Sequence, residues 1–207
     1  MTLKDDVSNA LWGIRISNID FWLSGSSHSS GSLHIDAAGL SRVQTAINDG
    51  RITVTYKSGL GVLALYYPKR NEMEVGATSV TGLAERAQVV HECVHALCDM
   101  IGARGTSVAS DEAAAYLAQT IYVNSAPGVG VVGALTPAPG DPYPGETDVI
   151  FQRAWDVVNA HHLHLSGGKG THLYRTDIGL LRTAVAAHHV YSASAAATTT
   201  PSYRGVP

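Results

Sequence analysis

The chain of 207 residues lacks the features that mark membrane proteins and nucleic-acid-binding proteins. No apolar run approaches the roughly eighteen residues that a membrane-spanning helix needs. Its 14 basic and 17 acidic residues leave a net charge of −3, which is too small and too mixed to favour a polyanionic partner. We therefore expect neither membrane nor nucleic acid among its partners. A chain of this length can bury one sizeable core, which predicts a single domain over residues 1–191.

The chain also has little cysteine and no leader-like start. Residues 1–6 carry neither the basic nor the apolar region of a signal peptide, which predicts a cytoplasmic protein; export by a dedicated leaderless machine would leave no mark in the sequence. Cys93 and Cys98 are the only cysteines. Five residues apart on a helix they project about 140° from each other, so we expect two reduced thiols and no disulfide.

One pentad indicates metal chemistry: His91-Glu92-Cys93-Val94-His95 has the form H-E-x-x-H. On a helix its two imidazoles lie about 40° apart around the axis and about 6 Å apart along it, so both can reach one tetrahedral ion. Glu92 stands beside that ion without binding it, where a general base can take a proton from water that the metal activates. The motif predicts one Zn²⁺ per chain.

The flanking sequence favours a helix with the histidines opposite the core. Apolar residues recur at helical spacing, namely Val89, Cys93, Leu97 and Met100. This stripe faces away from the edge that carries His91 and His95. Thr81 is expected to cap the start of the helix, and Gly102 supplies a left-handed stop.

A catalytic zinc site needs a third protein ligand and one open position. Cys98 shares the face of the histidines but lies about 10 Å along the helix from His91, so we expect it to pack near the site. Residues 110–124 read as a second helix, which the short link folds antiparallel onto the first. Glu112 is then level with His95, whereas the rival carboxylate Asp111 points about 100° away and suits the positive end of the helix dipole.

The pair of histidines followed by Glu112 on the next helix resembles the gluzincin branch of zinc metallopeptidases, over about residues 51–124. The resemblance implies that Glu112 is the third ligand, that Glu92 is the base and proton shuttle, and that peptides or proteins are substrates. Many gluzincins carry an acidic residue four positions after the third ligand, to orient a ligand histidine. This chain has Tyr116 there, so Tyr116 or Asp99 is expected to take that role.

The order of elements predicts an α+β, zincin-like fold. Residues 51–56, 62–67 and 73–75 are rich in β-branched and aromatic side chains and predict a small antiparallel or mixed sheet before the metal helix. The strand at residues 62–67 is the expected edge for a bound peptide. Residues 148–160 and 177–191 predict a helical C-terminal part.

Three further expectations concern the C-terminal half. The Gly- and Pro-rich residues 125–147 are either a lid over the cleft or a surface excursion without a role. His172, Tyr174 and Arg175 follow a glycine-rich run, and one of them is expected to stabilise the oxyanion of peptide hydrolysis. Residues 192–207 are rich in Ala, Ser and Thr and predict a disordered tail.

The resulting prediction is a peptidase that hydrolyses peptide bonds with metal-activated water and Glu92 as general base. Two alternatives stay open. The zinc site could stabilise a non-catalytic scaffold or partner-binding protein, in which case four protein ligands would close it. The same peptidase chemistry could also belong to a secreted toxin.

Overall fold

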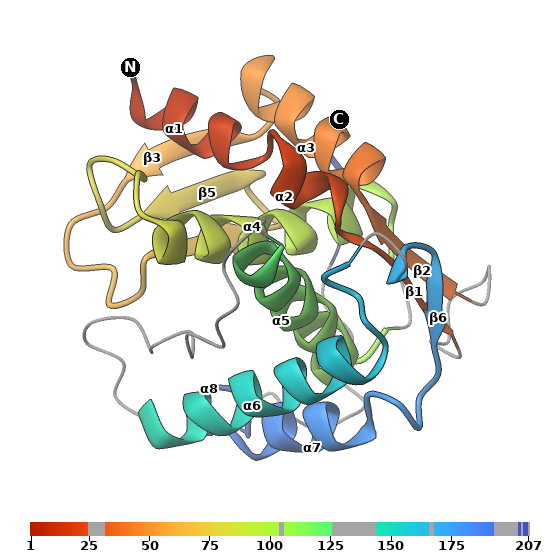
Figure 1. Cartoon of the computed structure of the whole chain (residues 1–207). Helices are drawn as coiled ribbons and strands as arrows, with labels where there is room; N and C mark the ends of the chain where they lie inside the picture. The colour runs from red at the N-terminus through yellow and green to blue at the C-terminus, as the bar shows by residue number, and fades with distance from the viewer. Residues whose placement is uncertain are drawn as a thin grey trace.

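The computed structural model describes residues 1–24, 32–103, 106–125, 144–165, 168–192, 203 and 205–206, the side chains of residues 144 and 145 excepted. The helices are α1 (Leu3–Ala10), α2 (Ile14–Ser17), α3 (Ala37–Asn48), α4 (Leu83–Met100), α5 (Val108–Asn124), α6 (Pro144–Ala160), α7 (Gly179–Ala187) and α8 (His189–Ser192). The strands are β1 (Asp20–Ser24), β2 (Ser32–Asp36), β3 (Thr53–Tyr56), β4 (Ala64–Tyr67), β5 (Glu72–Val75) and β6 (Thr171–Leu173). The predicted α+β class is confirmed (Figure 1).

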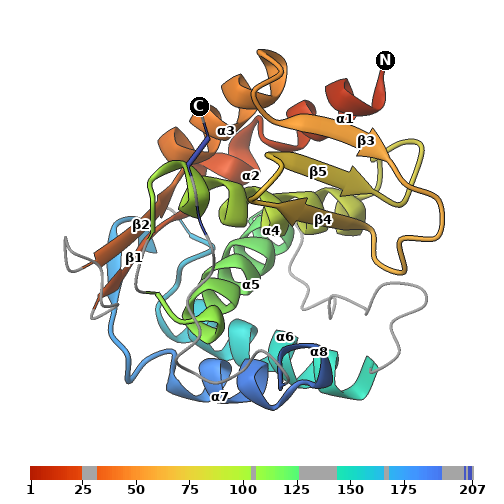
Figure 2. The same cartoon turned by 180° about the vertical axis from the view of Figure 1, so that it is seen from behind.

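Helix α5 lies at the centre of the molecule and packs against α4, α6 and α7 (Figure 1). It is buried on nearly all sides, and its alanines at positions 113, 114, 115 and 118 let the neighbouring helices approach closely. The two sheets lie on opposite sides of the α4–α5 pair (Figure 2). The metal motif is therefore built on the most enclosed pair of helices.

A first sheet, with strand order β2-β1-β6, was not predicted. Strands β1 and β2 are antiparallel, with Phe21 opposite Ile35 and Leu23 opposite Leu33, while β6 runs parallel to β1. These four apolar side chains are buried and alternate with less buried residues, which are polar except for Trp22. The period-2 pattern was thus present in the sequence.

The second sheet has the order β3-β5-β4 and is mixed. Strands β4 and β5 are antiparallel, but β3 pairs with β5 in parallel, so of the two predicted forms the mixed sheet is the one observed. The link from β3 to β4 contains Gly59 and Gly61 with φ of 73° and 78°, and it is too long for a two-residue hairpin. The β4–β5 hairpin therefore places β5 in the middle and leaves β4 at the edge, against α4.

Local capping sets where α4 and α5 begin. Helix α4 begins after Gly82, and the Glu85 carboxylate accepts hydrogen bonds of 2.9 Å from the backbone N–H groups of Thr81 and Gly82, so the predicted cap by the Thr81 side chain is wrong. The predicted stop at Gly102 is confirmed by its φ of 61°. The N-cap of α5 is Ser107, so this helix begins earlier than predicted, and Asp111 lies in its first turn.

The C-terminal half differs from the sequence prediction in three places. Helix α6 begins at Pro144, and the predicted helix over residues 177–191 is two helices because the backbone is extended at His188. Most of the glycine- and proline-rich segment, residues 126–143, lies outside the described residues. The two predictions for this segment, a lid over the cleft or a surface excursion, therefore stay predictions. Most of the predicted disordered tail, residues 193–202, 204 and 207, lies outside the described residues, and Tyr203 within it is 7% exposed.

Across the described ranges, no helix is long and apolar enough to cross a membrane.

Candidate metal centre

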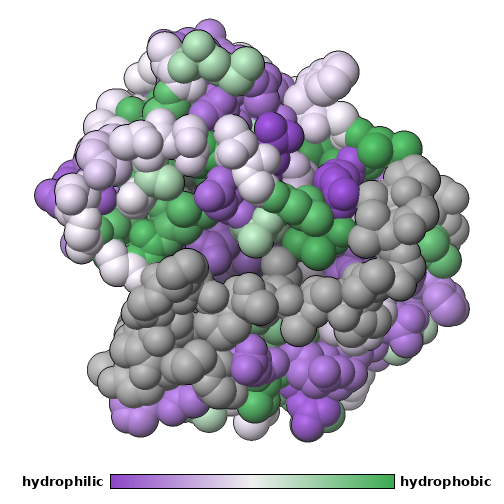
Figure 3. Space-filling view, turned by 60° about the vertical axis from the view of Figure 1, so that its left-hand side comes forward, coloured by the Kyte–Doolittle hydropathy of each residue, from purple (hydrophilic) through white to green (hydrophobic). Residues whose placement is uncertain are grey.

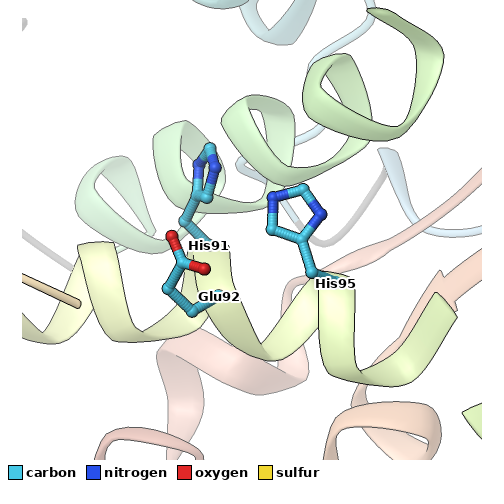
Figure 4. A group of neighbouring side chains, drawn as sticks. All are labelled: His91, Glu92 and His95. Carbon is cyan, nitrogen blue, oxygen red and sulfur yellow. The ribbon is translucent and has the colours of Figure 1, made fainter. Parts of the chain in front are cut away.

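Helix α4 carries three side chains that could hold a metal ion. His91, Glu92 and His95 offer ligand atoms that lie within 4.8 Å of one another, and the described residues contain no other such group. Figure 4 shows both imidazoles rising from α4 toward the neighbouring helix, with the Glu92 carboxylate beside them. The i, i+4 spacing of the histidines puts the two rings 5.0 Å apart, edge to face.

Helix α5 brings Glu112 to the same point. Its Oε2 lies 3.2 Å from His91 Nε2, and its Oε1 lies 3.5 Å from His95 Nε2. One carboxylate thus contacts the same nitrogen of each imidazole, as expected from an antiparallel α4–α5 pair. All three side chains are largely buried, with exposed fractions of 9% for His91, 13% for His95 and 14% for Glu112.

The other ring nitrogens are held by two residues of α5. His91 Nδ1 lies 3.0 Å from Gln119 Oε1, and His95 Nδ1 lies 2.8 Å from Asp111 Oδ2. Because an amide oxygen and an ionised carboxylate accept, each Nδ1 carries a hydrogen, and Nε2 is the ring nitrogen that faces Glu112. This outer arrangement is typical of metal-ligating histidines.

The two residues expected to orient a histidine have other positions. Tyr116 packs edge-on against the His91 ring at 4.6 Å. Asp99 is fully buried, and its Oδ2 accepts a 2.9 Å hydrogen bond from the Tyr66 hydroxyl. The residues that hold the histidine rings are instead Asp111, the rival carboxylate of the sequence prediction, and Gln119, which that prediction missed. Gln119 could have been found, since it lies two turns after Glu112 on the same helical face.

Glu92 is tied to the edge of the second sheet. Its Oε2 accepts a 2.8 Å hydrogen bond from the backbone N–H of Tyr66 in β4. Burial raises the pKa of Glu92, and the charges of His95 and His91 oppose that rise only in part. A raised pKa suits a carboxylate that must take up and release a proton near neutral pH.

Opposite charges face each other across the centre. Burial acts to lower the pKa of His95, but Glu112 and Asp111 outweigh it and raise that pKa well above its ordinary value. Burial acts to raise the pKa of Glu112, but His95 and His91 hold it well below its usual range. Glu112 thus favours a positive charge beside His95, and a bound cation can supply that charge in place of a proton.

These groups lie in a cleft of about 380 Å³. The edge strand β4 forms one wall through Leu65 and Tyr66, and α6 contributes Phe151 to the other. Val190 and Tyr191 of α8 also line the cleft. Figure 3, turned toward the side of β4 and α6, shows apolar and polar residues interspersed over this face. The cleft is large enough for a few residues of an extended peptide and includes the metal group.

The three residues expected to stabilise an oxyanion require a correction. His172 lies on β6 in the first sheet, where its Nδ1 is 3.2 Å from Ser24 Oγ, and Tyr174 is 61% exposed. Neither these two nor Arg175 lines the cleft, because β6 pairs with β1 on the other side of the molecule.

A hydroxyl group that does line the cleft belongs to Tyr191. The break in the backbone at His188 turns α8 toward α5, and the Tyr191 hydroxyl lies 3.3 Å from that of Tyr116. Burial and then the charge of Glu112 raise the pKa of Tyr191 well above its ordinary value. At neutral pH this hydroxyl is a hydrogen-bond donor.

The chain was compared with known protein families, curated proteins and solved structures. No protein-family model, no curated protein and no solved structure matches the chain.

Proposed function

We propose that the chain is a zinc-dependent peptidase of gluzincin-like type, with His91, His95 and Glu112 as the ligands of one Zn²⁺. One observation carries the proposal: the Glu112 oxygens lie 3.2 and 3.5 Å from the two Nε2 atoms. In a tetrahedron with metal–ligand bonds of about 2.1 Å, neighbouring ligand atoms are about 3.4 Å apart. The two separations between Glu112 and the histidines, each measured to a different carboxylate oxygen, are close to this value.

The donor set also fits zinc chemically. Two imidazole nitrogens and one carboxylate oxygen form a common catalytic set, and it leaves a fourth position for water or substrate. Asp111 and Gln119 hold both imidazoles in the tautomer that such a site requires. When bound, Zn²⁺ supplies a Lewis acid that polarises the scissile carbonyl and lowers the pKa of water from about 15.7 to about 7.

Glu92 then acts as the general base and proton shuttle. Its carboxylate lies beside the two histidines, and its bond to the Tyr66 N–H holds it at the wall of the cleft. It accepts a proton from the attacking water and passes that proton to the departing amine. The raised pKa of Glu92 supports both steps, because it makes the carboxylate a stronger base than an exposed one.

Tyr191 stabilises the developing oxyanion in this proposal. Peptide hydrolysis builds negative charge on the carbonyl oxygen, and a preorganised donor lowers that barrier most effectively where water is excluded. The Tyr191 hydroxyl comes from the opposite wall to β4 and is held by Tyr116.

The substrate lies along β4 in this proposal. This strand is at the edge of its sheet and lines the cleft, so an extended peptide can add to it through main-chain hydrogen bonds. The Leu65 side chain is 36% exposed and offers an apolar contact beside that edge.

The test is an unbiased peptide-library digestion combined with elemental analysis of the purified full chain. We expect one zinc per chain and cleavage that phenanthroline abolishes and added Zn²⁺ restores. A hydroxamate should also inhibit, because it needs the open metal position. A chain that holds zinc but cleaves no peptide above the background of Glu92→Gln contradicts the proposal and favours the non-catalytic scaffold.

A further inference from the structure

The last residues of the chain dock on the carboxylates around the candidate metal centre. Tyr203 is 7% exposed and lines the cleft. Its hydroxyl donates a short hydrogen bond to Asp111 Oδ2. The same oxygen faces His95 Nδ1 at 2.8 Å, so one carboxylate oxygen connects Tyr203 with a proposed zinc ligand.

A second contact ties this end of the chain to the other helix of the pair. The backbone N–H of Gly205 donates a 2.8 Å hydrogen bond to Asp99 Oδ1, whose partner oxygen accepts from the Tyr66 hydroxyl. Val206 packs against the hydrophobic core. The terminal segment, meaning Tyr203, Gly205 and Val206, therefore contacts both α4 and α5.

The bond from Tyr203 restrains a side chain that would otherwise have a choice of rotamers. Asp111 is 4% exposed, and turning its carboxylate by rotation about the side chain would break the bond to His95. Two donors on one oxygen hold that oxygen in place, and the Cys98 thiol packs beside both Asp111 and Tyr203. The orientation of a ligand imidazole depends on such an outer partner.

We propose that Tyr203 is a positioning residue of the metal centre, which acts through Asp111 to hold His95 in its ligating orientation. This inference rests on the proposed zinc site. It makes the C-terminal segment part of the centre, although that segment is 108 positions from His95 in the sequence (203 against 95).

The test compares zinc affinity of the full chain with that of Tyr203→Phe, which removes one hydroxyl. Tyr122→Phe is the matched control, because Tyr122 is an equally buried tyrosine of α5 whose hydroxyl faces Arg86 away from the cleft. Zinc dissociation constants are measured by competition with a chromogenic chelator. We expect about tenfold weaker binding for Tyr203→Phe, at the low end of the effect of outer partners on metal affinity. Tyr122→Phe should bind zinc as the unaltered chain does.

A double-mutant cycle separates positioning from general support of the fold. If Tyr203 acts through Asp111, adding Tyr203→Phe to a chain that already carries Asp111→Asn should change zinc affinity by less than about twofold. The visible spectrum of the cobalt-substituted protein should change with Tyr203→Phe and not with Tyr122→Phe. Circular dichroism of the metal-free variants checks that each is folded.

Four outcomes overturn the inference. If zinc affinity is unchanged in Tyr203→Phe, the inference is wrong but the proposed zinc site stands. The same holds if the effects of Tyr203→Phe and Asp111→Asn on zinc affinity are fully additive. If a chain lacking residues 203–207 holds zinc equally well and cleaves faster, the segment obstructs the cleft and does not position His95. An unaltered chain that binds no zinc removes both this inference and the proposed function.

Discussion

The sharpest perturbation of the proposed mechanism is Glu92→Gln. Glutamine keeps the shape of the side chain, and its Oε1 can still accept the 2.8 Å hydrogen bond from the Tyr66 N–H. The substitution removes the proton acceptor and leaves the proposed ligands His91, His95 and Glu112 unchanged. General acid–base groups contribute about 10²–10⁴-fold to the rate, equivalent to about 2.7–5.4 kcal/mol in the activation barrier. We therefore expect kcat/KM to fall by that factor.

Stability should move little in Glu92→Gln. Because burial raises the pKa of Glu92, the ionised carboxylate at neutral pH is less favourable in the folded chain than in the unfolded chain. A neutral amide avoids this cost, so we expect an unchanged or slightly higher melting temperature and one zinc per chain.

The assay is hydrolysis of the best fluorogenic peptide from the library digestion, with zinc content measured on the same samples. Glu85→Gln is the matched control, since it makes the same substitution on the same helix but at the N-terminal cap. It should retain nearly full activity. If Glu92→Gln keeps kcat/KM within about fivefold of the unaltered chain while fully zinc-loaded, Glu92 is not the general base.

Three other expectations concern proton exchange, packing and the oxyanion. Because the pKa of His95 is raised, zinc competes with a proton for this ring. Zinc affinity should therefore increase with increasing pH, by about tenfold per pH unit as long as the pH is below that pKa, and pH-independent binding in titrations would refute this. Gly76→Ala places a Cβ 2.7 Å from the carbonyl oxygen of Val62, so it should lower the free energy of unfolding by about 1–3 kcal/mol and the melting temperature by roughly 2–12 °C. The control Gly179→Ala, with open space around its Cβ, should not destabilise the fold. Tyr191→Phe should lower kcat by about 10²–10³-fold with unchanged zinc affinity, and a kcat within about threefold of the unaltered value would remove Tyr191 from the mechanism.

Local pattern predicted much of the α4–α5 pair. The i, i+4 spacing of His91 and His95 requires a helix for both to reach one ion, and the stop at Gly102 with a short link brings the next helix back antiparallel. Glu112 could be placed at the level of the histidines from these two facts alone. The start of α5 was less certain by pattern, because Ser107 and Ser110 are both good N-caps.

Long-range packing decided the residues that the sequence prediction misplaced. His172, Tyr174 and Arg175 follow a glycine-rich run that is compatible with a loop over the site, but β6 pairs with β1 and carries them to the other sheet. Tyr191 reaches the cleft only because the backbone breaks at His188.

By itself, the sequence determined which side chains share a helical face, because the period of 3.6 residues per turn is a local property of the backbone. It thereby predicted the pairing of His91 with His95 and the place of Glu112. Only the tertiary structure decided which partners surround them. The bond from Tyr203 to Asp111, and the edge position of β4, arise from contacts between segments far apart in the chain, whose free energy depends on the packing of the whole core and not on any local pattern.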